Sequence, residues 1–233
     1  MLICVIPARG GSKRIPRKNI REFCGKPMIG YPIEAAVASK LFAHVIVSTD
    51  DSEVAEIAKA YGATVPFQRP LSLANDHIGT TPVIEHATRW VVDNIGSPSS
   101  VCCVYATSPF LVGEDIVRGF DMLKINPSAD FVISVANYAF PIQRAVRLVD
   151  NKWIEMYQPE HFTTRSQDLE TSYHDAGQFY WGTTKAWLEQ KTILASHTLA
   201  CIMPRHRVQD IDTPEDWEFA QYLFRVASEM QRA

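Results

Sequence analysis

The sequence predicts an α/β fold built on a mostly parallel β-sheet. Short, almost entirely apolar segments alternate with stretches of helical periodicity, which is the pattern of strands joined by helical crossovers. The apolar segments lack the alternation of a half-exposed strand, so we expect helices to cover both of their faces. With 233 residues, the chain is long enough for one substantial core.

Four strands and four helices are expected in the first 135 residues. The strands are expected at residues 2–6, 44–49, 100–105 and 130–135. The helices are expected at residues 29–40, 51–61, from 80 or 81 onward, and 115–123. Asp51 is the expected N-cap of the second helix and Thr80 or Thr81 that of the third, because short polar side chains accept hydrogen bonds from the free N–H groups of a helix start.

The pattern changes after about residue 138. Strand-like pieces occur at residues 145–149, 152–157 and 178–182 without regular helices between them. We interpret residues of about 138–170 as an arm inserted into a single domain that spans residues 1–233. A final helix is expected to begin at Thr213-Pro214, since proline is favoured at the first position of a helix.

Composition and charge exclude several classes of protein. The hydrophobic share of 46% and the charged share of 21% are ordinary globular values, which excludes a disordered or fibrous chain. A net charge of −3 argues against a nucleic-acid partner. No apolar run reaches the roughly 18 residues of a membrane span, and no charged leader precedes the first apolar run, so neither a membrane partner nor a signal peptide is expected.

The five cysteines, without a C-x-x-C pair, are expected to be reduced thiols in a cytoplasmic protein, mostly buried as small hydrophobes.

A basic loop follows the first strand. Residues 9–21 contain six basic residues and no acid, although the whole chain is acidic. Gly10 and Gly11 would let backbone N–H groups approach a ligand, and open α/β sheets bind ligands just past the carboxyl ends of their strands. The loop has neither Walker A nor G-x-G-x-x-G spacing. These features favour a polyphosphate ligand; the alternative is a solvated basic loop.

Two further stretches carry candidate chemistry. In Asp210-Ile211-Asp212, an extended chain would place both carboxylates on one side, where Mg²⁺ would relieve their repulsion. The alternative is that Asp212 caps the final helix, and both interpretations can hold.

Residues 165–178 are dense in polar and aromatic groups: Arg165 suits a carboxylate, while the alternative is an exposed loop. His174 beside Asp175 suggests acid–base chemistry, but no nucleophile elbow supports a hydrolase triad.

Taken together, these motifs resemble the CMP-nonulosonate synthetase family of cytidylyltransferases, which join CMP to sialic-acid-like or Kdo-like sugars. The matching motifs, in family order over almost the whole chain, are residues 6–13 with 18–19, 48–51, 69–70, 107–109 and 210–212. The sequence is most similar to the branch of the family that uses pseudaminic acid. That similarity rests on residues 13–15, 26–28, 31–36, 164–169, 173–177 and 208–213.

The resemblance implies a reaction, a fold and a set of site residues. CTP and a nonulosonic acid would give a CMP-sugar and pyrophosphate by Mg²⁺-dependent in-line attack of the anomeric hydroxyl on the α-phosphate. The implied fold is a Rossmann-like three-layer sandwich with a mostly parallel mixed sheet and a protruding arm that forms a homodimer. The implied catalytic residues are Arg9, Lys18 and Asp212, and the implied metal ligands are Asp210 and Asp212. The implied substrate-binding residues are Ser12 and Lys13 in the basic loop, Asn19, Arg69 and Thr80 at the cytidine, Arg165 and Gln167 at the sugar or phosphates, and Tyr105, Gln143, Arg144 and Asp175.

Two departures from the sialic acid branch bear on the sugar. Tyr105-Ala106 stands where that branch has a sugar-binding glutamine, and Gln143-Arg144 where it has a phosphate-facing lysine. Both point away from sialic acid itself and leave the nucleotide chemistry intact. The alternatives are a synthetase for CMP-sialic acid, CMP-legionaminic acid or CMP-Kdo, and a non-catalytic nucleotide-sugar binder. Pyrophosphate release that requires a nonulosonic acid would separate an enzyme from a binder.

Overall fold

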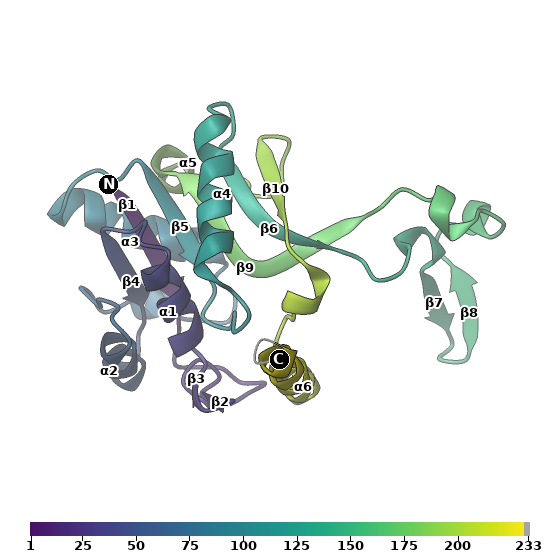
Figure 1. The fold of residues 1–233 in the computed structure, drawn as a ribbon, viewed down its shortest axis with the longest axis horizontal. Coiled ribbons are helices and arrows are strands. Elements are labelled where there is room, and N and C mark those ends of the chain that lie inside the picture. The colour runs from purple at the N-terminus through teal and green to yellow at the C-terminus, as the bar shows by residue number, and fades with distance from the viewer. Residues whose placement is uncertain (231–233) are drawn as a thin grey trace.

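The computed structural model describes residues 1–230 and is organised around one six-stranded sheet (Figure 1). The strand order is β10 (Thr198–Ile202), β6 (Phe131–Asn137), β9 (Tyr173–Thr183), β5 (Ser100–Val104), β1 (Leu2–Pro7) and β4 (His44–Ser48). Only β9 runs antiparallel to its neighbours, and the other adjacent pairs are parallel. The predicted mostly parallel α/β sheet is therefore confirmed.

Helices cover both faces of this sheet. One face carries α1 (Gly30–Ala38), α2 (Ser52–Ala60) and α4 (Gly113–Ile125), and the other carries α3 (Thr80–Asn94) and α5 (Thr184–Leu188). Strand β1 supplies both layers, because Cys4 and Ile6 pack into the first core cluster and Ile3 and Val5 into the second, and all four are fully buried. Burial of alternate residues on opposite faces explains why the strand sequence is apolar throughout.

Most predicted elements are present, with shifts at their ends. The Asp51 carboxylate caps α2 as expected, accepting from the backbone N–H groups of Glu53 (2.9 Å) and Val54 (3.0 Å). The expected threonine cap of α3 is wrong: the N-cap is Gly79, and the Thr80 hydroxyl bonds elsewhere. Strand β10 and helix α5 were not predicted. The first is an edge strand that is only partly buried, and the second has five residues.

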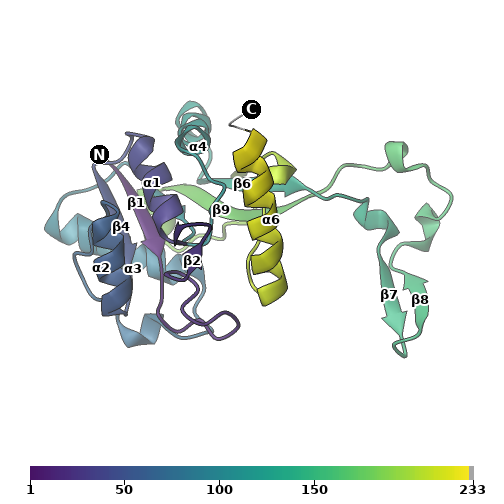
Figure 2. The same ribbon diagram turned by 60° about the horizontal axis from the view of Figure 1, so that its bottom comes forward.

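The C-terminal helix α6 (Pro214–Met230) fixes the basic loop and the adjoining β2 (Glu22–Phe23) and β3 (Lys26–Pro27) (Figure 2). Its Trp217 ring meets Phe23 edge to face, with ring centroids 5.3 Å apart, in a third cluster that includes Ile15 and Ile211. The Arg21 guanidinium lies over the Trp217 ring, 4.9 Å from its centroid. The C-terminal helix thereby holds the basic loop in place.

A protruding arm leaves the sheet between β6 and β9 (Figures 1 and 2). Its base is closed by a hydrogen bond from Tyr138 N to Ser172 O (3.0 Å). The arm contains a hairpin of β7 (Val146–Val149) and β8 (Trp153–Met156) and the single-turn helices η2 (Ile142–Arg144), η3 (Pro159–His161) and η4 (Ser166–Asp168). The turn between the two strands is closed by a hydrogen bond from Lys152 N to Val149 O (3.1 Å), and its central residues Asp150 and Asn151 have φ of 53° and 52°, as a type I′ turn requires. Two further single-turn helices, η1 (Leu71–Leu73) and η5 (Arg205–Arg207), lie on the body of the molecule.

All five cysteines are free, and four of them are buried, as the sequence predicts. Within residues 1–230, no helix has both the length and the apolar character that crossing a membrane requires.

Candidate active site

A cleft of about 480 Å³ opens at the carboxyl ends of β1 and β5. The basic loop forms one side, the start of α3 forms another, and Tyr105, which follows β5, contributes to the wall. The predicted site residues that line it are Arg9, Ser12, Lys13, Lys18, Asn19, Arg69, Thr80, Tyr105 and Asp212. These residues come from segments far apart in the sequence, and the edge of the sheet brings them together.

The cleft is positively charged. Five cationic side chains line it against two carboxylates, which leaves three positive charges in excess. One carboxylate, Asp76, bridges Arg9 (Nη1–Oδ1 2.5 Å) and Lys13 (Nζ–Oδ2 2.5 Å). Hydrogen bonds from Lys13 and Arg9 lower the pKa of Asp76 to about 2. An anionic ligand would compete with this carboxylate for both cations.

The other carboxylate, Asp212, lies between two cations of the same loop. Lys18 Nζ donates to Ile211 O (2.6 Å) and to Asp212 Oδ1 (3.2 Å), and Arg14 contacts Asp212 Oδ2 at 2.8 Å. The Lys18 side chain is only 18% exposed, so its ammonium group is held in one place. The loop and the D-x-D segment are therefore one site, although more than 190 residues separate them.

The helix-cap interpretation of Asp212 is wrong. The Thr213 hydroxyl accepts from Asp216 N (3.2 Å), and the Asp216 carboxylate accepts from Thr213 N (2.8 Å), a reciprocal cap of α6. The same Asp216 oxygen accepts from Asp212 N (3.1 Å). Because the helix start is satisfied by these two residues, the Asp212 carboxylate is left for the cleft.

Asp210 lies beside the cleft and not in its lining. Ile211 between the two aspartates is fully buried, as an extended D-x-D segment predicts. Partial desolvation raises the pKa of Asp210, and the charge of Asp212 raises it further. Among residues 1–230, no group of three or more His, Cys, Asp or Glu side chains could hold a metal. A cation at this pair would therefore take its remaining ligands from water or substrate.

Arg69 is a buried cation at the far side of the cleft. It is 4% exposed, and burial lowers its pKa to about 10. Its hydrogen bonds go to the hydroxyl (3.1 Å) and the carbonyl of Ser48 and not to a carboxylate. A buried guanidinium without a carboxylate partner suits an acceptor atom supplied by a ligand.

Gly10 and Asn19 shape the loop from within. Gly10 N donates to Asp50 Oδ1 (3.0 Å), and a Cβ at Gly10 would lie 2.5 Å from the Asp51 carboxylate. The N–H of Gly10 is thus already bonded, which corrects the expectation that both glycines face a ligand; only Gly11 stands in open space. Asn19 Nδ2 donates to Arg9 O (2.9 Å) from a side chain that is nearly buried.

Hydroxyl groups form the wall next to α3. Thr80 Oγ1 and the Tyr105 hydroxyl are 2.7 Å apart. The Tyr105 ring meets Tyr180 edge to face at 5.3 Å, and burial raises the pKa of both phenols. Asp175 accepts from the Tyr180 hydroxyl and from Gly177 N (2.8 Å). Asp175 is therefore linked to the cleft through Tyr180 and does not line it.

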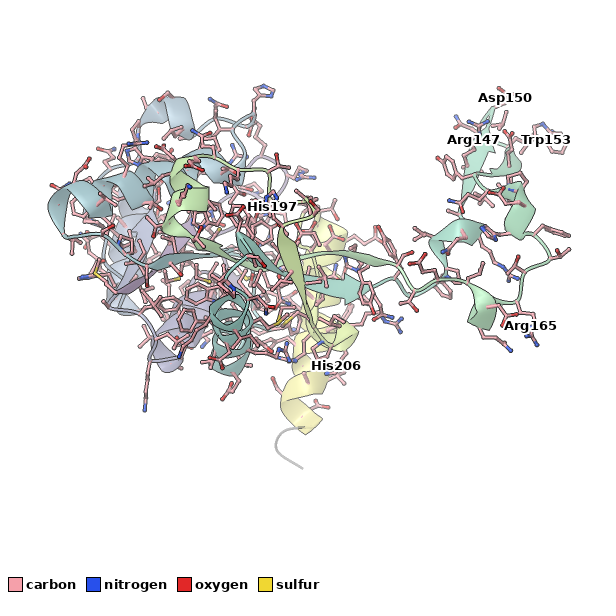
Figure 3. The ribbon with its side chains drawn as sticks, turned by 90° about the horizontal axis from the view of Figure 1, so that it is seen from above. Arg147, Asp150, Trp153, Arg165, His197 and His206 are labelled. Carbon is pink, nitrogen blue, oxygen red and sulfur yellow. The ribbon has the colours of Figure 1, made fainter. Side chains whose placement is uncertain are left out.

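The remaining predicted site residues lie on the arm. Gln143, Arg144, Arg165 and Gln167 are all outside the lining of the cleft (Figure 3 labels Arg165). Their contacts are within the arm: Gln143 Nε2 donates to a backbone carbonyl at 3.0 Å, and Arg165 Nε donates to Asp168 at 2.7 Å. One chain alone does not bring these side chains to the nucleotide end of the sheet.

Two charged residues of the cleft were missed by sequence reasoning. Arg14 belongs to the basic loop, so its charge was the available signal, but the sequence did not show that it faces Asp212. Asp76 follows no motif. Only the fold brings it to Arg9 and Lys13, across more than 60 residues of sequence.

Comparisons with known proteins agree with this geometry. Residues 3–227 match the family described as cytidylyltransferase. The chain is 44% identical over 227 residues to a pseudaminic acid cytidylyltransferase of Campylobacter jejuni, covering 97% of each chain. It is 33% identical over 242 residues to a CMP-N,N′-diacetyllegionaminic acid synthase of Legionella pneumophila, covering 98% of each.

Among solved structures, the fold is similar to that of a CMP:2-keto-3-deoxy-manno-octonic acid synthetase complexed with CTP. The TM-score is 0.70 at 19% identity, over 97% of this chain and 99% of the other. At that identity the likeness concerns the fold alone.

Proposed function

The chain belongs to the cytidylyltransferase family, and from that premise we propose that it transfers CMP from CTP to a nonulosonic acid, with pseudaminic acid as the preferred sugar. The observation that carries the proposal is the cleft, where five cations face two carboxylates at the carboxyl ends of β1 and β5. The anomeric oxygen of the sugar bonds to the α-phosphorus, the bond to pyrophosphate breaks, and the hydroxyl proton passes to water. The 44% identity to the pseudaminic acid cytidylyltransferase of Campylobacter jejuni supports pseudaminic acid as the sugar.

The basic loop is proposed to bind the triphosphate. Arg9, Ser12 and Lys13 line the outer part of the loop and would contact the phosphates that leave as pyrophosphate. Lys18 is proposed to act at the α-phosphate, because its ammonium group is fixed by two oxygen contacts and is mostly shielded from solvent. A cation placed in advance where negative charge develops lowers the barrier without reorganisation.

The cytidine is proposed to lie between Arg69 and Thr80. Arg69 uses part of its guanidinium on Ser48 and lines the cleft with the rest, so it can donate to a carbonyl of the base. Asn19 is proposed to shape the same subsite, because its side-chain amide donates to the carbonyl of Arg9 and so fixes the loop beside it.

Asp210 and Asp212 are proposed to hold Mg²⁺. The pair fits the ion: two carboxylates lie close enough for the charge of one to raise the pKa of the other, and phosphate and water oxygens would complete the coordination. When bound, Mg²⁺ would offset the phosphate charge and polarise the α-phosphate. Asp212 would then exchange one of its two contacts, with Arg14 or Lys18, for the ion.

We propose that the arm forms a homodimer and that Arg165, Gln167, Gln143 and Arg144 reach the sugar from a second copy. Within one chain these side chains lie on the arm and outside the cleft lining. The arm also exposes large apolar side chains that a partner would cover: Phe140, Val146, Leu148, Trp153, Ile154, Tyr157 and Phe162. Free, mostly buried cysteines support a cytoplasmic location.

Tyr105 is proposed to favour pseudaminic acid over sialic acid. Its hydroxyl already bonds to Thr80, so the side chain offers a sugar its ring more than its polar atom. Pseudaminic acid carries a methyl group and a second acylamino group where sialic acid carries hydroxyls. A buried hydroxyl without a partner costs about 1–3 kcal/mol, or one to two orders of magnitude in kcat/KM.

A sugar panel tests the proposal. Pyrophosphate release from CTP is measured with pseudaminic acid, N,N′-diacetyllegionaminic acid, N-acetylneuraminic acid and Kdo, each with Mg²⁺. We expect pseudaminic acid to exceed N-acetylneuraminic acid by about tenfold to a hundredfold in kcat/KM. Equal values would contradict the preferred sugar and leave a general nonulosonate cytidylyltransferase. No release with any of the four sugars would overturn the reaction itself.

A further inference from the structure

Two of the six basic side chains in the basic loop, Arg17 and Arg21, do not line the cleft. Arg21 lies over the ring of Trp217. Arg17 instead contacts the start of α2, where its guanidinium donates to both carboxylate oxygens of Asp51, with Nη2 3.2 Å from Oδ1, and to the carboxylate of Glu53. A guanidinium that meets a carboxylate through two nitrogens is held in one orientation. The ion pair between Arg17 and Asp51 is called the loop tether below.

The backbone at Arg17 is left-handed, with φ of 56°. Arg17 follows Pro16 in a turn that is closed by a hydrogen bond from Lys18 N to Ile15 O (3.2 Å). A proline followed by a left-handed residue is the pattern of a type II turn, which favours glycine at the left-handed position because glycine has no Cβ. Arginine supplies what glycine cannot, a side chain that forms the loop tether.

Asp51 is a fixed partner for Arg17. Its Oδ1 accepts from two backbone N–H groups at the start of α2 (2.9 and 3.0 Å), and its side chain is 21% exposed. The hydrogen bond from Arg17 lowers the pKa of Asp51, so the carboxylate stays charged. The preceding Asp50 accepts from Gly10 N (3.0 Å). This segment therefore holds the basic loop at two points, Gly10 and Arg17.

Lys18 follows the turn directly. Its ammonium group lies at Ile211 O (2.6 Å) and Asp212 Oδ1 (3.2 Å). The chain before it is fixed twice, because Ile15 is fully buried in the third cluster and the loop tether holds Arg17. A change of φ at Arg17 would rotate the chain that follows, so the loop tether sets the direction in which Lys18 leaves the turn.

We infer that Arg17 is a positioning residue: the loop tether holds the left-handed turn that directs Lys18 into the cleft. The inference rests on the proposed function, in which Lys18 acts at the α-phosphate. Arg17 is not in the cleft lining, so it acts through Lys18 and not by touching substrate. A misplaced Lys18 would leave the other loop cations to bind the triphosphate, and the loss should therefore appear in kcat more than in KM.

Acetylation of lysines in the free enzyme tests the position of Lys18 without turnover. The Lys18 side chain is 18% exposed, whereas that of Lys185 on α5 is 74% exposed and serves as the internal reference. Rates are measured by mass spectrometry after brief exposure to an acetylating reagent. We expect Arg17→Gly to raise the ratio of the Lys18 rate to the Lys185 rate by about three- to tenfold, the effect of losing a partly exposed two-point ion pair. The unfolding temperature should stay close to that of the wild type, because glycine suits the turn.

Asp51→Asn breaks the loop tether from its other end. The amide oxygen still accepts the backbone hydrogen bonds that cap α2, while the amide NH₂ faces the guanidinium of Arg17. Arg17→Gly removes a positive charge and Asp51→Asn a negative one, so a general electrostatic effect would change labelling and turnover in opposite directions. Loss of the loop tether should change them in the same direction, and the double variant should behave like either single variant.

Lys59 and Glu56 provide matched controls on the same helix. They form an exposed ion pair within α2, with Nζ 2.8 Å from Oε1. Lys59→Gln and Glu56→Gln repeat the two changes of charge at this pair. Because such exposed pairs are weak and neither residue contacts the basic loop through this pair, both variants should leave Lys18 labelling and kcat unchanged.

Steady-state kinetics with CTP and pseudaminic acid test the consequence for turnover. We expect Arg17→Gly and Asp51→Asn each to lower kcat by about tenfold and to change the KM for CTP by less than about threefold. In a Lys18→Met background, Arg17→Gly should have no further effect on kcat, because the group that it positions is gone.

The inference is overturned if Lys18 labelling is unchanged in Arg17→Gly or in Asp51→Asn, or if the two variants act in opposite directions. An effect of Arg17→Gly on kcat that persists in the Lys18→Met background would also overturn it. A wild type without turnover on any sugar, combined with the expected labelling, would overturn the proposed reaction and support the loop tether.

Discussion

The cleft and the arm are opposite kinds of surface on one chain. In the cleft, charged side chains from distant segments contact one another, as Arg9 and Lys13 both do with Asp76. On the arm, apolar side chains project into solvent: Ile154 is 73% exposed and Phe162 75% exposed. The cleft has polar groups that one chain satisfies, whereas the arm has apolar groups that one chain leaves uncovered.

This difference separates the part of the proposed site that one chain assembles from the part that we propose a second copy completes. The proposed nucleotide-binding groups, such as Lys18 and Arg69, are held by contacts inside the body of a single chain. Sugar-binding groups were expected on residues that the structure places on the arm. We therefore expect substitutions in the cleft to act on chemistry without changing assembly, and substitutions on the arm to act on assembly first.

The largest expected effect is loss of activity in Asp212→Asn. The substitution removes a proposed Mg²⁺ ligand and one partner of Lys18 and Arg14, and metal effects on phosphate chemistry amount to several kcal/mol. Pyrophosphate release should fall at least about a hundredfold at limiting Mg²⁺. Wild-type turnover under that condition would contradict the metal assignment.

A neighbouring aspartate provides the matched control. Asp216→Ala removes the reciprocal cap of α6, so it should lower the free energy of unfolding by about 1 kcal/mol and keep most of the activity. Asp212→Asn should lower the activity and leave the free energy of unfolding nearly unchanged. Activity loss of equal size in both variants would mean that the segment acts only through the position of α6.

The parts of the fold that could be predicted are those that leave a pattern in consecutive residues. The sheet was predictable because β1, β4, β5 and β6 are apolar on both faces, which leaves a signal in consecutive residues. Strand β10 has an apolar run of four residues, 199–202, but periodicity does not distinguish a strand from a helix in so short a run, and the strand was missed. The basic loop was predictable because its charge is concentrated within 13 consecutive residues.

The missing parts of the site depend on contacts between distant segments. Asp76 reaches the loop only through the fold. The link from Asp175 to Tyr180 depends on a bulge, and a bulge is defined by pairing with another strand, not by its own sequence. Gln143 and Arg165 were expected near substrate by resemblance, and the structure places both on the arm, outside the lining of the cleft.

A substitution on the apolar face of the hairpin should weaken the proposed dimer. Leu148 pairs with Ile154 across the hairpin, and both are exposed on the same face. Ile154→Glu places a charge in this face, so it should raise the dimer dissociation constant by at least about tenfold, and activity should fall with it. Sedimentation velocity over a micromolar concentration series measures the constant.

The opposite face of the hairpin supplies the control. Glu155 pairs with Arg147 in a solvent-exposed ion pair, so Glu155→Gln should leave assembly nearly unchanged. A wild type that sediments as a monomer at these concentrations would rule out the arm as a dimer interface. A dimer that persists in Ile154→Glu would place the interface on another surface.

The smallest expected effect concerns Asp76, the carboxylate that occupies the cleft in the absence of substrate. Because its oxygens contact Arg9 and Lys13, a triphosphate must displace it. Asp76→Asn should therefore tighten CTP binding, by about two- to fivefold, since exposed ion pairs are weak. Added salt should weaken CTP binding to both proteins, because the loop cations remain, and narrow the difference between them.

The pH dependence of the gain in CTP affinity in Asp76→Asn identifies the cause of that gain. The pKa of Asp76 is lowered to about 2, so its pairing contributes in full above the ordinary carboxyl pKa and is lost only as the pH falls toward 2. The gain from Asp76→Asn should thus be the same at pH 5.5 and pH 8, measured by titration calorimetry with CTP. A gain that disappears at pH 5.5 would show that Asp76 is protonated there and is not held by Arg9 and Lys13. The exposed-surface variant Asp93→Asn, which changes the net charge equally, should show no gain at either pH.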